Sequence, residues 1–183
     1  MKKVYIILDL EATCYERGEK PEGFVNEIIE IGAVKVDENY EYIDEYCKFL
    51  KPKNHPIISK FCNELTTITQ EDIDKAEDAR DVLIDFFEWC KEDGKEVVYV
   101  SWGFYDKNQF KYDLRINKLD KEIINDSNHI SFKHLYGKVN RVKPMGLKKA
   151  CYREKIDFEG THHRGIDDAK NILKVLKSSN IKL

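Results

Sequence analysis

The sequence lacks long apolar runs and has few cysteines. None of its 183 residues lies in a stretch that approaches the length of a membrane span. Only five apolar residues, Val4 to Leu8, precede Asp9, and so short a run is too small for the core of a signal peptide. The five cysteines are odd in number, scattered and never spaced as Cys-x-x-Cys, which argues against a disulfide framework and a zinc site. These absences predict a soluble, cytoplasmic protein with reduced cysteines and no membrane partner.

Repeats, low-complexity tracts and linkers are also missing. With 42% hydrophobic residues the chain can bury a core, so we expect one domain over residues 1–183. The net charge of −3 hides a basic segment, residues 133–155, in which eight basic residues face one acid, Glu154. Such a segment can hold phosphate, although a lysine-rich helix face is more often solvated surface. The eight basic residues are Lys133, Lys138, Arg141, Lys143, Lys148, Lys149, Arg153 and Lys155.

The hydrophobic pattern predicts an α/β domain in which helices flank a mixed central sheet. Three strands come first and are joined as a meander, whereas the later strands alternate with helices. The expected strands lie near residues 4–9, 28–36, 43–50, 97–100 and 129–132. The expected helices lie near residues 58–62, 70–74, 79–90, from 105 onward, 146–152 and 165–177.

An Asp-x-Glu pair ends the first expected strand. Asp9 and Glu11 project to the same side because successive strand residues alternate faces, which places them within about 7 Å of each other. One hard cation can bridge that spacing. Neighbouring carboxylates repel, so at least one pKa rises unless a cation offsets the charge. For this pair alone, a metal site and a solvated strand end are equally good interpretations.

Two further acids follow later elements. Asp106 comes after the strand at 97–100, where ligands of α/β sheets bind, although an acid in a first helical turn is common without any ligand. Asp168 heads the apolar stripe of the last expected helix, with Ile172 one turn on, whereas Asp167 heads a polar row. We therefore expect Asp168 to face the protein and to need a partner, while Asp167 caps the helix or lies in water.

Two adjacent histidines precede this helix in a loop bracketed by glycines. His163 stands five residues before Asp168, and the loop could let it swing over a site that the helix builds. His162 is the competing candidate, because it stands five residues before Asp167, just as His163 stands five residues before Asp168. Paired surface histidines are more often inert than catalytic, so the acids must decide their role.

The four acids Asp9, Glu11, Asp106 and Asp168 would bring four carboxylates to one point. Such a cluster is unstable without compensating cations, and oxygen-only ligands select Mg²⁺ or Mn²⁺ rather than zinc. We therefore expect two divalent ions in the site.

The order Asp-x-Glu, Asp and His-x(4)-Asp resembles the DEDDh exonucleases, the DnaQ-like branch of the ribonuclease H-like fold. The tyrosine subtype of that family would carry Tyr where Arg164 stands, so the histidine subtype fits this sequence. Segments over nearly the whole chain resemble the KapD-like and histone-mRNA 3′-exonuclease group, namely residues 9–14, 26–33, 61–70, 101–106 and 163–171. The resemblance implies a ribonuclease H-like exonuclease fold.

The resemblance also implies an activity. It is hydrolysis of single-stranded RNA or DNA from a free 3′ end, with a slight preference for RNA, to release nucleoside 5′-monophosphates. Asp9, Glu11 and Asp168 would hold one ion, and Asp106 would be an outer ligand through water. Glu11 and His163 are the expected catalytic residues, with His163 as the proton acceptor.

The expected substrate contacts follow from the same resemblance. They are Leu10, Ala12, Thr13, Trp102 and His163, although a Trp beside a buried strand is more often core. The rival function is a catalytically silent nucleic-acid-binding module, which would be expected to lose an acid or the histidine, and none is missing. A second alternative is a nuclease that acts as one subunit of a polymerase or RNA-processing assembly. The sequence shows no recognisable partner-binding tail, but surfaces can serve, so protein partners stay unknown.

Overall fold

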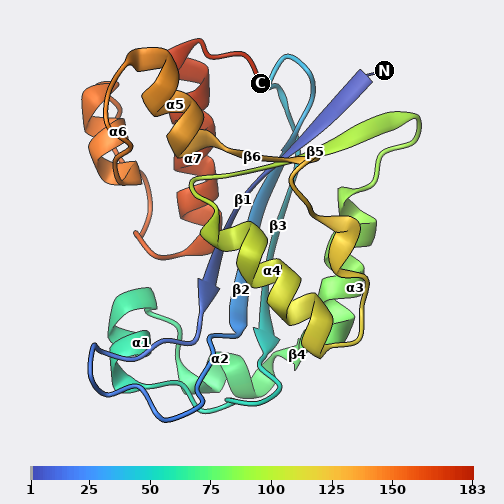
Figure 1. Cartoon of the computed structure of the whole chain (residues 1–183), viewed down its shortest axis with the longest axis vertical. Coiled ribbons are helices and arrows are strands. Elements are labelled where there is room, and N and C mark those ends of the chain that lie inside the picture. The colour runs from blue at the N-terminus through green and yellow to red at the C-terminus, as the bar shows by residue number, and fades with distance from the viewer. Residues whose placement is uncertain (1) are drawn as a thin grey trace.

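The computed structural model describes residues 2–183, and one mixed sheet runs through it. The strand order is β4-β3-β2-β1-β5-β6 (Figure 1). β1 pairs antiparallel with β2 and parallel with β5, and β2 pairs antiparallel with β3. The strands are β1 (Lys2–Ala12), β2 (Ile28–Val36), β3 (Tyr42–Lys51), β4 (Glu77–Asp78), β5 (Lys95–Ser101) and β6 (His129–Ser131). The predicted mixed sheet with a leading meander is confirmed.

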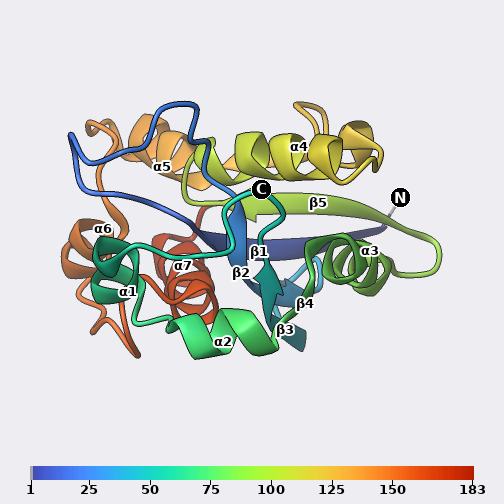
Figure 2. The same ribbon diagram turned by 90° about the horizontal axis from the view of Figure 1, so that it is seen from below.

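Helices cover both faces of this sheet, with α3 and α4 on one side of β1 and α5, α6 and α7 on the other (Figure 1). The short helices α1 and α2 lie at the end of the sheet where β1 ends, in front in Figure 2. No helix within residues 2–183 is long and apolar enough to cross a membrane. The helices are α1 (Lys60–Thr66), α2 (Gln70–Lys75), α3 (Ala79–Cys90), α4 (Tyr105–Ile116), the 3₁₀ turn η1 (Lys121–Ile123), α5 (Phe132–Asn140), α6 (Leu147–Arg153) and α7 (Gly165–Ser179).

Alternation along β1 decides which way its acids point. Tyr5 and Ile7 pack in the core under α7, whereas Ile6 and Leu8 pack in the core under α3 and α4. The odd-numbered positions therefore face α7, and the acids that follow continue this row. β1 is longer than predicted, because its pairing with β2 continues to Ala12 and includes both acids in the strand.

Helix α5 was not expected from the sequence. The sequence pattern predicts only a strand that ends at Phe132, whereas in the structure Phe132 and Tyr136 are buried one turn apart on a helix. Gly137 inside this helix lowers its intrinsic propensity, which hid the signal. Its lack of a side chain is needed, since a Cβ there would lie 2.9 Å from the carbonyl oxygen of Val142.

Two glycines let α7 begin directly against the strands. A Cβ added to Gly32 of β2 would lie 2.0 Å from the carbonyl carbon of Gly165, the first residue of α7. A Cβ added to Gly165 would lie 2.9 Å from the carbonyl oxygen of Asp9. Only glycine permits such an approach of two backbones. The contact carries the first turn of α7 to the end of β1.

Candidate active site

Three carboxylates meet where β1 ends and α7 begins. Asp9 and Glu11 come from β1, and Asp168 comes from the first turn of α7. One oxygen of each lies within 4.8 Å of the others, which is close enough for a shared cation. The predicted register of α7 is confirmed, because Asp168 is buried together with Ile172, whereas Asp167 turns away and accepts a hydrogen bond from Thr161 N at 2.8 Å.

Burial and mutual repulsion disfavour the charged forms of these acids. Burial raises the pKa of Asp9 well above its usual value, and the charges of Asp106 and Asp168 raise it further. Burial, followed by the charge of Asp168, raises the pKa of Glu11 to about 9. The pKa of Asp168 is raised to about 6, again mainly by burial. A cation at this point would remove both penalties.

Asp106 borders the same pocket as the three carboxylates, at the start of α4. Its Oδ1 accepts a hydrogen bond from the backbone N–H of Leu10 at 3.2 Å, so it holds the segment between the two acids of β1. Burial raises the pKa of Asp106 to about 6. Its oxygens do not belong to the group within 4.8 Å, which suits an outer position better than direct contact with the same ion.

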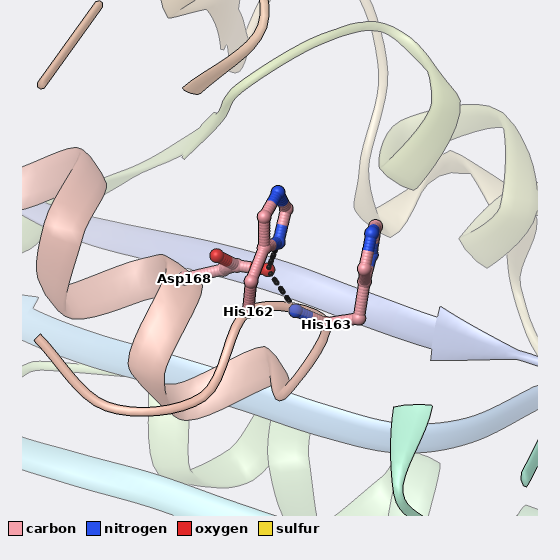
Figure 3. A group of neighbouring side chains, drawn as sticks. All are labelled: His162, His163 and Asp168. Atoms are coloured by element: carbon pink, nitrogen blue, oxygen red, sulfur yellow. Dashed lines mark hydrogen bonds and ion pairs between the residues drawn. The ribbon is translucent and has the colours of Figure 1, made fainter. Parts of the chain in front are cut away.

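The loop before α7 brings both histidines to Asp168 (Figure 3). Asp168 Oδ2 accepts the backbone N–H of His163 at 3.0 Å and faces Nδ1 of His162 at 3.2 Å. The two imidazole rings stack with centroids 4.0 Å apart, and the ring of His163 lies on the far side of His162 from the carboxylate. Burial lowers the pKa of each histidine. His162 is thus tied to Asp168 through its ring, whereas His163 is tied through its backbone, and both side chains border the same cavity.

Asp168 Oδ1 has no hydrogen-bond partner among residues 2–183, although the atom is buried. A buried oxygen without a partner is costly. Asp168 shares the cluster with the carboxylates of Asp9 and Glu11, which cannot donate a hydrogen bond when ionised. The donor set and this orphan oxygen therefore fit a hard divalent cation.

An ion pair between a fully buried acid and a partly exposed arginine, not foreseen from the sequence, fixes the same loop. Arg164 Nη2 donates to Glu30 Oε1 at 3.0 Å, and the backbone N–H of Gly165 donates to Glu30 Oε2 at 3.0 Å. Glu30 stands in β2 opposite Glu11 and is fully buried. An acid inside the apolar run of that strand was a signal that a cationic partner must exist. The pair locks the backbone between His163 and α7.

A cavity of about 480 Å³ opens over the carboxylates. Of the predicted substrate contacts, Leu10, Ala12, Trp102 and His163 line it. Trp102 also belongs to the core and donates to the carbonyl of Met145, so both interpretations of this residue apply. Lining residues that the sequence did not single out for this cavity are Cys14, Asn26, Leu65, Gly103, Tyr105, Lys133, Gly146, Leu147 and His162.

Thr13 does not line this cavity. It is buried, its hydroxyl accepts the backbone N–H of Glu27 at 2.9 Å, and its own N–H donates to the Glu27 carbonyl. These two bonds join the end of β1 to the start of β2. A contact between Thr13 and a nucleotide therefore stays a prediction.

The chain is similar in sequence to known nucleases. The family described as exonuclease (RNase T) matches residues 6–176. The chain belongs to this exonuclease family. It is 33% identical to the human 3′-5′ exoribonuclease 1 over 92% of this chain and 50% of that protein. It is 28% identical to the probable 3′-5′ exonuclease KapD of Bacillus subtilis (strain 168) over 94% of this chain and 82% of that protein.

Solved structures agree in fold. The nuclease domain of 3′hExo, a DEDDh family member bound to rAMP, superposes with a TM-score of 0.89 at 27% identity, covering all of this chain and 95% of that chain. The predicted DEDDh resemblance and ribonuclease H-like exonuclease fold are confirmed. Family membership also implies divalent metal use, as the carboxylates do. The chain spans only 27% of the ERI1 exoribonuclease 2 of Xenopus laevis, to which it is 31% identical.

Proposed function

We propose that this protein is a metal-dependent 3′-to-5′ exonuclease that releases nucleoside 5′-monophosphates from single-stranded nucleic acid with a free 3′ hydroxyl. The observation that carries the proposal is the convergence of Asp9, Glu11 and Asp168 beside His163 at the floor of one cavity. RNA is the proposed substrate ahead of DNA. This choice is supported by the names of the relatives, exoribonucleases among them, and by one solved relative that recognises the histone mRNA stem-loop.

The proposed cofactors are two Mg²⁺ or Mn²⁺ ions. Oxygen-only donors favour these ions, and the residues that would hold them are Asp9, Glu11 and Asp168, with Asp106 as an outer ligand through water. When bound, such ions lower the pKa of a water and stabilise charge on the phosphate.

The chain's own residues prepare the remaining chemistry. His163 is the proposed general base, and its lowered pKa keeps the imidazole neutral, and so able to accept a proton, at neutral pH. Asp168 fixes the backbone of His163, and the Glu30–Arg164 pair fixes the next residue. Leu10, Ala12 and Trp102 would contact the terminal nucleotide. The silent-module alternative is not favoured, because none of the four acids and neither histidine is missing.

The proposed function is tested with 5′-labelled RNA and DNA oligonucleotides in Mg²⁺ or Mn²⁺. We expect stepwise shortening from the 3′ end and mononucleotide products, all abolished by excess chelator and restored by added metal. A 3′-phosphorylated strand is the matched control and should be resistant. Cleavage in chelator, or equal degradation of a circular strand, would contradict the proposal.

We propose that two lysines of the basic segment hold the substrate backbone. Lys133 lines the cavity, and Lys148 Nζ lies 5.5 Å from the Phe158 ring beside His162. Each phosphate contact contributes a slope of about −0.7 to log affinity against log salt for a single strand. We expect Lys133→Gln and Lys148→Gln, each in an inactive Asp9→Asn background, to flatten that slope by about one contact.

Fluorescence anisotropy across a salt series measures these slopes. Lys2→Gln is the matched control, because Lys2 is exposed at the opposite end of β1. Unchanged slopes for both cavity-side variants would show that these lysines do not contact phosphate.

A further inference from the structure

Helix α6 presents a basic face with an exposed aromatic ring. Its residues Leu147, Ala150 and Cys151 are buried, while the other four point to solvent. Tyr152 is 85% exposed, the largest fraction among the exposed large hydrophobic residues of 2–183. A ring this exposed buries little apolar surface, and the stability of the fold therefore does not explain an aromatic residue at this position. We call the four solvent-facing residues the α6 face: Lys148, Lys149, Tyr152 and Arg153.

The cations around this ring have no acidic partners. Among residues 2–183, none of the eight basic residues of the basic segment lies within ion-pair distance of a carboxylate, whereas twelve lysines and arginines elsewhere do. Glu154, the single acid of the segment, accepts hydrogen bonds from Tyr136 and Ser178 instead. The positive charge of the α6 face is therefore available to a polyanion.

The α6 face continues from the active site. Gly146 and Leu147, at the start of α6, line the cavity over the carboxylates. Lys148 Nζ lies over Phe158, whose ring centroid is 5.3 Å from that of His162, which in turn stacks on His163. Tyr152 stands five residues after Leu147, about 8 Å farther along the helix axis. A strand that left the cavity along α6 would need only a few nucleotides to span this distance.

A surface hollow lies beside the ring. It measures about 510 Å³ and is lined by Tyr152, Arg153, Lys155, Ile156 and Asp157. The lining thus combines an aromatic ring, an apolar side chain and two cations with one acid, Asp157. Aromatic and cationic groups together bind a base and its phosphate without reading sequence.

We propose that the α6 face is a second nucleotide subsite, in which Tyr152 stacks on a base upstream of the 3′-terminal nucleotide while Lys149 and Arg153 hold the adjoining phosphates. This inference rests on the proposed exonuclease function and adds to it a footprint longer than the cavity. The subsite raises the affinity for longer strands and leaves the chemical step unchanged.

The test compares a dinucleotide with a dodecamer of the same 3′ sequence. Tyr152→Ala should raise KM for the dodecamer about tenfold, the loss expected for one base–aromatic stack, with kcat unchanged. KM for the dinucleotide, which cannot reach the α6 face, should not move. Tyr152→Phe keeps the ring and should behave as the wild type. Tyr42→Ala is the matched control, since Tyr42 is 55% exposed on β3, near the start of β1 and away from the site.

The outcomes separate the two proposals. The subsite would be overturned if Tyr152→Ala left KM for the dodecamer unchanged, or if it raised KM for the dinucleotide as much as for the dodecamer. Neither result would contradict the proposed exonuclease function. A wild-type protein that hydrolyses neither substrate would overturn the proposed function instead. Anisotropy with the labelled dodecamer would then still decide the subsite, because Tyr152→Ala must bind about tenfold more weakly if the ring stacks.

Discussion

Replacing Asp168 by Asn is expected to abolish nucleotide release, whereas Asp167→Asn should keep most of it. Asp168 is the buried acid that joins the carboxylates of β1 and also receives the backbone N–H of His163. Loss of the Asp168 carboxylate therefore removes a metal ligand and at the same time loosens the loop that carries the histidines. We expect the rate to fall by about a thousandfold or more, a scale typical of losing one preorganised electrostatic group. An Asn at position 167 can still accept the hydrogen bond from Thr161 N through its amide oxygen.

Single-turnover rates on a labelled RNA strand measure this ranking. Thermal unfolding of both variants is the control, because each must be folded at the assay temperature. The reverse ranking would mean that Asp167 is the ligand. Because His162 stands five residues before Asp167, as His163 does before Asp168, that result would also favour His162 over His163 as the general base.

The site could be predicted in part from local periodicity. An alternating strand fixes the common face of Asp9 and Glu11, and the helical stripe through Ile172 distinguishes Asp168 from Asp167. Both inferences need only neighbours within a few residues. The position of Asp106 followed from the general rule that ligands gather at the carboxyl ends of strands.

What the sequence could not supply depends on contacts between distant segments. Glu30 and Arg164 are 134 residues apart, and nothing local pairs them. The approach of Gly165 to Gly32 is equally nonlocal, and without it α7 could not bring Asp168 to β1. The cavity wall combines residues of loops and helices far apart in the chain, such as Leu65 and Lys133, which no periodicity connects. Nonlocal contacts therefore complete the site, whereas local periodicity determines which way each predicted residue faces.

Raising the pH from 7 to 9 is expected to destabilise the metal-free protein through Glu11, whose pKa burial raises to about 9 in the folded protein from its usual 4.5. The folded state keeps this proton after the unfolded state has lost it. Stability from this group is therefore greatest below the unfolded pKa and falls as the pH rises toward 9. Each pH unit in this window costs about 1.4 kcal/mol. The pKa values of Asp106 and Asp168 are about 6, so both carboxyl groups have mostly lost their protons before pH 7.

Thermal unfolding in chelator at both pH values, for the wild type and Glu11→Gln, measures the effect. A hydrogen bond with Cys14 lowers the pKa of Cys62 to about 7, so this thiol ionises in both proteins and makes the folded state more stable as the pH rises. The difference in Tm between the two proteins removes this common contribution and isolates that of Glu11. Glu11→Gln should gain stability relative to the wild type as the pH rises, by several degrees in Tm for a chain of this size. Excess Mn²⁺ should reverse the trend in the wild type only, since the metal binds the ionised carboxylate. A wild-type curve parallel to that of Glu11→Gln in chelator would mean that Glu11 is ionised in the folded protein without metal, and that the carboxylate cluster needs no cation to offset its charge.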